Sequence, residues 1–191
     1  MNISEPSTEL VGKCLIAMPD MLDPRFRGSV VFLCAHSGDG AMGLIVNKRV
    51  EDVKLTDLMD QLSIPKGTSG NDWPVYFGGP VEHGRGFVLH TPEYRSDLST
   101  LDAGDAFAMT ATIDILEDIG AGKGPEKSLV ALGYAGWGPG QLEAEIAANG
   151  WLIVEAGPEV VFDQPDAEKW SASLGALGID PAILSSSGGN A

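Results

Sequence analysis

Short apolar segments bounded by Gly, Pro, Asp or Asn recur along the chain, a pattern typical of β-strands that lie in a sheet. Amphipathic stretches separate some of these segments, but they are fewer and irregularly spaced. The predicted strands are Cys14–Met18, Ser29–Ala35, Gly43–Asn47, Val75–Phe77, Gly86–His90, Ala106–Thr110, Ser128–Gly133 and Trp151–Glu155, with Val160–Phe162 as a further candidate.

Helices are predicted where apolar residues recur at helical spacing or where capping residues mark the ends. In Lys54–Leu62, three leucines and a methionine fall at i, i+3, i+4 and i+7, which gives one apolar face. End signals mark three more helices: from Thr112 to about Ile119, Pro139–Ala148, and from Asp166 to Leu177. Asp180-Pro181 then begins one more short turn.

The order of these elements predicts the fold class. Ser29–Ala35 and Gly43–Asn47 are separated by the polar, glycine-containing HSGDGAM, which favours a hairpin with a long turn. Because the helices do not alternate regularly with the strands, we expect an α+β domain rather than a βαβ repeat. Its sheet should be mixed and largely antiparallel. Residues 10–184 would form this single compact domain, with polar segments 1–9 and 185–191 as flexible tails.

Length and composition are those of an ordinary globular domain. The chain has 191 residues, of which 43% are hydrophobic and 20% charged. No apolar run approaches the roughly 18 residues of a membrane span, and the start MNISEPSTELVGK lacks the layout of a signal peptide. We therefore expect a cytoplasmic protein with no membrane partner. Its two cysteines, Cys14 and Cys34, should then be reduced, buried thiols.

Charge disfavours direct nucleic-acid binding. The net charge is −15, and residues 55–191 contribute −14 of it, with six basic and 20 acidic side chains. Nucleic-acid binding draws much of its affinity from Lys and Arg at phosphates, so a face built from this region would repel a duplex. The residues able to form a basic patch all lie in the N-terminal quarter: Lys13, Arg25, Arg27, Lys48 and Arg49.

Familiar catalytic signatures are missing from the sequence. The stretch GAGKG at 120–124 resembles a phosphate loop, but Glu117 occupies the first glycine position of that motif and Gly124 follows the lysine. We interpret it as the C-terminal turn of a helix. The chain also has no GxSxG, HExxH or paired CxxC motif. No cofactor is therefore predicted.

Cys34-Ala35-His36 is the one cysteine–histidine combination at short spacing. On a regular strand, residues 34 and 36 point to the same face, which would allow a Cys–His pair or two ligands of a zinc site. The alternative is a small buried thiol at a strand end followed by a turn histidine. We favour the alternative and predict no metal, because no second cluster with ligand spacing supports one.

Two glycine-rich segments, 78–90 and 133–145, carry the remaining chemistry. If Arg85 and the start of the helix at Pro139 face one cleft, formed by 78–90 and 133–141, they would bind an anion. His90 or His36 would then move a proton, and Asn47 would orient a polar substrate. The ligand-binding candidates are Asn47, Arg85, His90 and Trp137. The alternative is that both segments are strand exits shaped for packing, with Trp137 in the core.

Several strings give the chain a family resemblance. They are LVGKCLIAMPDMLDPRF (10–26), SVVFLCAHSGDGAMGLIVNK (29–48), VYFGGPV (75–81), RGFVLH (85–90), LGYAGWGPGQLEAEIAANGWL (132–152), VFD (161–163) and LGID (177–180). With them, nearly the entire chain closely resembles the AlgH/YqgE family of bacterial proteins. The resemblance implies one compact α+β domain whose sheet is branched and partly barrel-like, surrounded by helices.

The resemblance implies little about activity. The family is labelled as transcriptional regulators after a role of one member in alginate control, and no catalytic residues or cofactors come with that label. We therefore expect an indirect regulatory or interaction protein that binds a protein partner or an anionic small molecule. The alternative is a small-ligand binder or an enzyme that acts on an anionic substrate in the cleft of 78–90 and 133–141.

Overall fold

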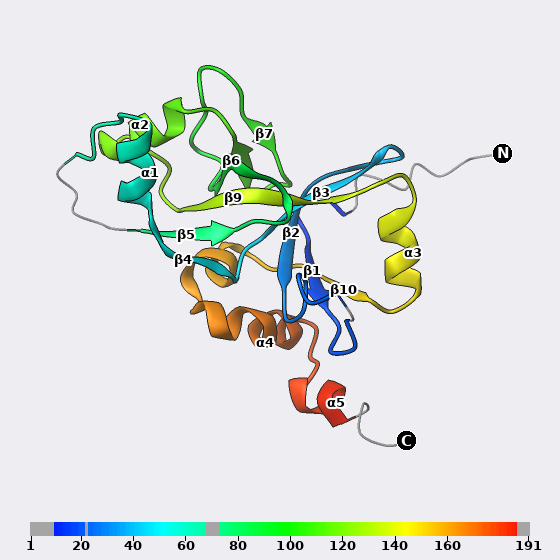
Figure 1. The fold of residues 1–191 in the computed structure, drawn as a ribbon. Coiled ribbons are helices and arrows are strands. Elements are labelled where there is room, and N and C mark those ends of the chain that lie inside the picture. Colours follow the sequence, from blue (N-terminus) through cyan, green and yellow to red (C-terminus); the bar gives the residue numbers. More distant parts are fainter. Residues whose placement is uncertain (1–9, 22, 68–72, 187–191) are drawn as a thin grey trace.

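A computed structural model describes residues 10–21, 23–67 and 73–186 (Figure 1). The strands are β1 (Cys14–Ala17), β2 (Val30–Ser37), β3 (Gly40–Ile45), β4 (Arg49–Lys54), β5 (Pro74–Phe77), β6 (Val81–His90), β7 (Leu101–Asp102), β8 (Ala108–Thr110), β9 (Ser128–Trp137) and β10 (Trp151–Val154). The helices are α1 (Leu55–Gln61), α2 (Asp114–Gly120), α3 (Gln141–Ala147), the π-helical turn η1 (Glu159–Asp163), α4 (Asp166–Ala176) and α5 (Pro181–Ser186). Among these described helices, none has both the length and the apolar character needed to cross a membrane.

The strands of the described residues form one curled, largely antiparallel sheet, which confirms the predicted α+β class. Its main path runs β10-β1-β2-β3-β9-β6-β8-β7, and β4 and β5 form a branch beside it. The branch joins through β5, which pairs with β9 in parallel. In Figure 1, β9 crosses the centre of the molecule, with α1 and α2 near one end and α3 at the other. The sheet is therefore mixed and branched, as the family resemblance implied.

Glycines permit the branch, because three strands approach β9 closely there. Gly133, with φ of 75°, divides β9 into a first half between β5 and β6 and a second half that pairs with β3. Gly78 donates its N–H to the Leu132 carbonyl and accepts from the Ile45 N–H, both at 2.8 Å. A Cβ on Gly79 would lie 2.1 Å from the backbone of Tyr134. These contacts leave no room for a side chain, so glycine is required for the close approach.

Alternation along the strands divides the core between the two faces of the sheet. Val30, Phe32 and Cys34 of β2 pack in one cluster, together with residues of η1 and α4. Val31 and Leu33 pack in a second cluster with α3 on the opposite face. A third cluster lies where α1 and α2 pack against β6 and β9. Helices thus cover several parts of the sheet, as expected.

Some predicted element boundaries were wrong. Val160–Phe162 lies in η1, where the N–H groups of Val160 and Val161 both bond to the Gly157 carbonyl. A short apolar run does not distinguish a strand from a buried helical turn. Strands β4 and β7 were not predicted, because their exposed, charged sequences lack an apolar alternation.

The hairpin of β2 and β3 is confirmed, but its turn is shorter than predicted. Its strands extend to Ser37 and from Gly40, so only Gly38 and Asp39 lie between them. At the C-terminus, α5 includes residues 185 and 186, which were predicted to belong to a tail. The predicted tails 1–9 and 187–191 lie outside the described residues.

Candidate functional site

An open cavity of about 800 Å³ lies against strands β2, β3, β6, β8 and β9. Its apolar lining includes two methionines, a phenylalanine and a tyrosine: Met42, Phe87, Met109 and Tyr134. Arg85 stands at the polar part of the lining and, among the described residues that line this cavity, is the only lysine or arginine. The cavity thus combines an adaptable apolar surface with one arginine, and the carboxylates of Asp39 and Glu82 also line it.

Arg85 is presented by a bulge in β6. Val81 pairs with Tyr134 and Gly86 with Leu132, so residues 82–85 loop out opposite Gly133. The Arg85 guanidinium lies 5.2 Å from the centre of the Phe87 ring, and its Nη1 lies 3.5 Å from Glu82 Oε2. More than half of the side chain remains exposed, at 56%. Arg85 therefore retains access to a ligand despite its two neighbours.

Only part of the predicted cleft is assembled. Trp137 borders the cavity, but its indole packs on the other face of the sheet, with ring centres 6.3 Å from Phe26 and 6.0 Å from Trp151. The described lining ends at this residue, so the start of α3 is not part of it. Helix α3 also begins later than predicted, after Gly140, whose φ is 73°. The structure thus separates Arg85 from the helix start that was expected to share an anion with it.

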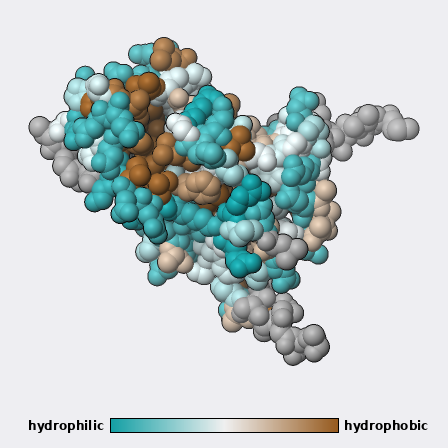
Figure 2. Space-filling view, viewed as in Figure 1, coloured by the Kyte–Doolittle hydropathy of each residue, from teal (hydrophilic) through white to brown (hydrophobic). Residues whose placement is uncertain are grey.

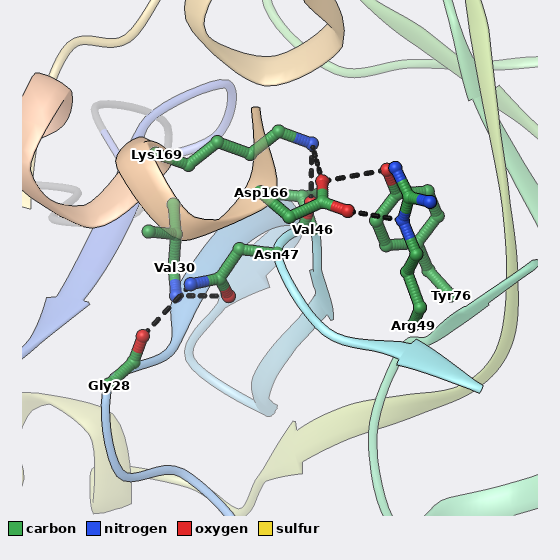
Figure 3. Close-up of polar contacts among 8 residues, drawn as sticks. All are labelled: Gly28, Val30, Val46, Asn47, Arg49, Tyr76, Asp166 and Lys169. Atoms are coloured by element: carbon green, nitrogen blue, oxygen red, sulfur yellow. Dashed lines mark hydrogen bonds and ion pairs between the residues drawn. The ribbon is translucent and has the colours of Figure 1, made fainter. Parts of the chain in front are cut away.

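Two further candidates lie outside the cavity lining. His90 is fully buried, with Nδ1 2.8 Å from the Thr91 carbonyl and Nε2 2.8 Å from Thr110 Oγ1. Because a carbonyl only accepts, Nδ1 donates to it and Nε2 of the neutral ring accepts from the Thr110 hydroxyl. Asn47 accepts from the Val30 N–H at 3.0 Å and donates to the Gly28 carbonyl at 2.9 Å (Figure 3). Asn47 thus holds the backbone of residues 28–30, and His90 links β6 to the Thr110 side chain of β8.

The buried position of His90 predicts a dependence of stability on pH. Burial lowers the pKa of His90, although the Thr91 carbonyl opposes the shift. The unfolded chain therefore binds a proton near pH 6.5 while the folded protein does not, and the contribution of His90 is lost as pH falls through its folded pKa. We expect the stability of His90→Gln to fall less steeply than that of the wild type between pH 7.5 and 5, measured by urea denaturation.

The control for this prediction is His83→Gln, which removes an exposed histidine from the bulge of β6. This variant should keep the wild-type slope of stability against pH. An equal slope in the wild type and in His90→Gln would contradict the prediction.

The predicted common face of Cys34 and His36 was wrong. The pairing passes from Leu33 opposite Gly43 to Ala35 opposite Met42, so Cys34 is an extra residue in β2. Such a bulge reverses the alternation, and His36 lies opposite Ala41 on the second-cluster face. There its Nε2 lies 2.5 Å from Glu143 Oε1 of α3, and His36 lowers the pKa of Glu143.

Cys34 lies on the first-cluster face, where its environment is that of a core residue. Both cysteines are free and buried. Burial raises the pKa of Cys14 and of Cys34 to about 12, so both are protonated at neutral pH. Within the described residues, no three His, Cys, Asp or Glu side chains gather closely enough to hold a metal ion.

A polar cluster that was not predicted from the sequence surrounds Asp166 at the start of α4 (Figure 3). Asp166 Oδ1 accepts from the Tyr76 hydroxyl at 2.7 Å and lies 2.9 Å from Lys169 Nζ. Its Oδ2 accepts from Arg49 Nε at 2.5 Å. Lys169 Nζ also donates to the Val46 carbonyl at 2.8 Å. The cluster therefore links β4 and β5 to α4.

Each group of this cluster has a shifted pKa. Burial lowers the pKa of Lys169, although Asp166 opposes that shift. Burial alone would raise the pKa of Asp166, but hydrogen bonds from Lys169, Tyr76 and Arg49 lower it overall. Burial and Asp166 both raise the pKa of Tyr76. Since the cluster's charged groups bind one another, we interpret it as structural. The only signal in the sequence was the i, i+3 spacing of Asp166 and Lys169.

The basic residues of the N-terminal quarter are largely engaged by other groups. Lys48 Nζ donates to the Arg25 carbonyl at 3.1 Å, so these two residues lie together. The Arg25 guanidinium pairs with Asp23 at 2.7 Å, however, and Arg49 pairs with Asp166. These carboxylates reduce the positive potential that a nucleic acid would encounter.

Comparison with known sequences gives consistent matches. A family model described as AlgH-like matches residues 14–182. A UPF0301 protein of Jannaschia sp. (strain CCS1) is 56% identical over 193 residues and covers 100% of both chains. A UPF0301 protein of Cereibacter sphaeroides is 55% identical over 183 residues, covering 96% of this chain and 100% of the relative.

Comparison with solved structures agrees. The solution structure of the AlgH protein from Pseudomonas aeruginosa is similar over 100% of both chains, with a TM-score of 0.78 and 43% identity. The crystal structure of protein DIP2367 from Corynebacterium diphtheriae has a TM-score of 0.68 and 22% identity, and covers 90% of this chain and 87% of that one. The second likeness concerns the fold alone.

Proposed function

The chain belongs to the AlgH-like family, which has no established molecular function, and from its cavity we propose that it is a regulatory binding protein. Its ligand would be a small molecule with an apolar, aromatic body and an anionic group. The observation that carries this proposal is the placing of Arg85 beside Met42, Phe87, Met109 and Tyr134 in one open cavity. Apolar pockets with few polar groups are the usual form of small-molecule sites.

The positions of the histidines support binding rather than catalysis. Proton transfer requires a titratable group within hydrogen-bond reach of the ligand. His90 is buried outside the cavity lining. His36 lines the cavity, but its side chain is only 2% exposed and its imidazole is bound to Glu143. Asn47 likewise binds backbone groups of residues 28–30. The residues available to a ligand are therefore suited to holding it.

Any effect on transcription would be indirect. The chain carries a net charge of −15, and three cations of its N-terminal quarter, Arg25, Lys48 and Arg49, are paired or bonded as described. Direct binding to DNA or RNA would have to overcome this repulsion. We propose that the protein responds to its ligand in the cytoplasm and passes the signal on through a protein partner.

The ligand class can be tested with 1-anilinonaphthalene-8-sulfonate, which combines an aromatic body with a sulfonate. We expect saturable binding, followed by fluorescence, and a dissociation constant about fivefold higher for Arg85→Gln. Loss of a partly exposed ionic contact costs about 1 kcal/mol, which corresponds to this factor. Met42→Glu, which introduces a carboxylate beside the sulfonate, should weaken binding further.

Arg25→Gln provides a matched control, because Arg25 also pairs with an acid and lies 5.6 Å from a phenylalanine ring, yet does not line the cavity. This variant should bind the dye as the wild type does. N-phenyl-1-naphthylamine, which lacks the sulfonate, should be insensitive to Arg85→Gln. Unchanged affinity for the sulfonate in both Arg85→Gln and Met42→Glu would contradict the proposal.

A further inference from the structure

A separate apolar groove of about 300 Å³ lies between α1, α2 and the strands β6, β8 and β9. Leu58 and Leu62 line it from the α1 side, Ile113 and Leu116 from the α2 side, and Val88 and Val130 from the sheet. In Figure 2, apolar residues gather in a band on this end of the molecule, between hydrophilic residues. The groove is therefore open to solvent on a surface that is otherwise mainly polar.

Two residues at this groove are unusually exposed for their type. Leu62 is 45% exposed and Ile113, which precedes α2, is 51% exposed. Single exposed apolar residues are common, but these two line one groove. Contiguous apolar surface rimmed by polar residues is characteristic of interaction sites.

The helices beside the groove are acidic. Helix α1 contains Asp57 and Asp60, and α2 contains Asp114, Glu117 and Asp118, while neither helix contains a lysine or arginine. Two cations oppose this charge in part, because Lys66 pairs with Asp60 at 2.8 Å and Arg85 lines the groove. Glu117 lies one helical turn after Ile113, and so on the same side of α2. A partner that covers the groove therefore meets a negative rim, which basic residues would complement.

The negative charge beside the groove limits which protein segments can bind there. A second copy of the chain also carries a net charge of −15, so two grooves brought together would repel each other. The chain's own segments outside the structure offer no match either. Residues 1–9 contain two glutamates, 68–72 are TSGND and 187–191 are SGGNA, and none of these segments contains a lysine or arginine. The occupant should be a different, basic partner.

The pairing of the strands that line the groove indicates which backbone conformation the bound partner segment has. The strands that line the groove each have two neighbours in the sheet: β6 lies between β8 and β9, and β8 lies between β6 and β7. The lining half of β9 lies between β5 and β6. Among the described residues at the groove, only the short part of β6 before Val88 lacks a partner in β8. An extended peptide would therefore find little free strand edge, whereas a helix satisfies its own backbone hydrogen bonds.

We propose that the groove between α1 and α2 binds an amphipathic helix of a partner protein, with apolar anchors facing the groove and lysine or arginine beside them. Anchors spaced at i, i+3 and i+4 would enter between Leu62 and Ile113. The basic residues would face the acidic rim formed by α1 and α2. This groove is distinct from the ligand cavity, although Arg85, Ala111 and Thr112 line both.

The probe for this proposal is a fluorescein-labelled 18-residue peptide of leucine and lysine, with the leucines along one helical face. Fluorescence anisotropy at about 0.15 M salt should show saturable binding to the full chain. Leu62→Glu and Ile113→Glu should each raise the dissociation constant at least about tenfold, since each places a charge where an apolar anchor enters. Leu177→Glu is the matched control, because Leu177 is also 45% exposed but does not line the groove.

Two comparison peptides distinguish the contribution of a continuous apolar helix face from that of the peptide's positive charge. A peptide with the same composition in scrambled order should bind at least tenfold more weakly, and one with glutamate in place of lysine should not bind. Equal binding of the ordered and scrambled peptides, or equal loss with Leu177→Glu, would overturn the proposal. Met42→Glu, at a residue that lines the ligand cavity but not the groove, should leave peptide binding unchanged, so this result is independent of the dye experiment.

Other occupants would give different outcomes, each of which overturns the proposal. Sedimentation equilibrium showing a wild-type dimer that Ile113→Glu dissociates would identify a second copy in the groove. Titration with decanoate that shifts the NMR signals of Leu62 and Ile113, while the leucine–lysine peptide fails to bind, would identify an acyl chain. Circular dichroism of each variant verifies that the fold is retained.

Discussion

Gly79→Ala is expected to destabilise the protein by at least about 3 kcal/mol, which sums a strained backbone torsion and a steric overlap. The residue has φ of 156°, a conformation that side-chain-bearing residues rarely adopt. An added Cβ would lie 2.1–2.3 Å from three backbone atoms of Tyr134 and Ala135. Because backbone atoms of β9 cannot move aside independently, the branch of the sheet would have to open. Urea denaturation followed by circular dichroism measures the loss.

Gly86→Ala is the control within the same glycine-rich segment. Gly86 has no positive φ, and a Cβ there would have no heavy atom within 4 Å. We expect its free energy of unfolding to stay within about 0.5 kcal/mol of the wild type. Equal stabilities of Gly79→Ala and Gly86→Ala would show that the close approach of β5 and β9 is not needed.

Asp166→Ala is expected to cost about 3–5 kcal/mol, the usual effect of removing one partner of a buried ion pair. Lys169 is only 1% exposed, and without Asp166 its ammonium group would retain the Val46 carbonyl and the face of the Tyr76 ring. Adding Lys169→Met should recover much of the loss, because methionine fills similar space without a buried charge. Denaturation of the single and double variants measures both effects.

The same variant carries a prediction about pH. Because the pKa of Asp166 is lowered in the folded protein, its stabilisation is present above the ordinary carboxyl pKa, near 4. It is lost as pH falls through the lower folded pKa. The stability difference between the wild type and Asp166→Ala should therefore shrink below about pH 4. A difference that stays constant to pH 2, or a loss below about 1 kcal/mol at pH 7, would contradict the assigned role.

The sequence was sufficient to predict the fold class, because it depends on local patterns. Apolar runs on either side of a polar, glycine-containing segment predicted the β2–β3 hairpin. The predicted cleft of 78–90 and 133–141 is only partly assembled, because the cavity lining ends at Trp137. The alternative interpretation of Trp137 as a core residue also agrees with its packing.

Features that depend on one irregular residue or on distant partners were not predictable. The common face of Cys34 and His36 assumed an unbroken period of two, and a single bulge at Cys34 reversed it. The Asp166 cluster joins residues that lie 90 and 117 positions apart in the chain. No spacing rule covers such separations, so only the three-dimensional structure reveals Arg49 and Tyr76 as partners.

The place of β9 in the sheet has a consequence for synthesis on the ribosome. Its partners β3, β5 and β6 all precede it in the chain. Strand β1 likewise pairs with β10, which is synthesised much later. A nascent chain that ends before Ser128 therefore exposes strand edges with no neighbour, which favours aggregation. The centre of the sheet can therefore be completed only after β9 has emerged, and a chaperone that shields those edges would act mainly before that point.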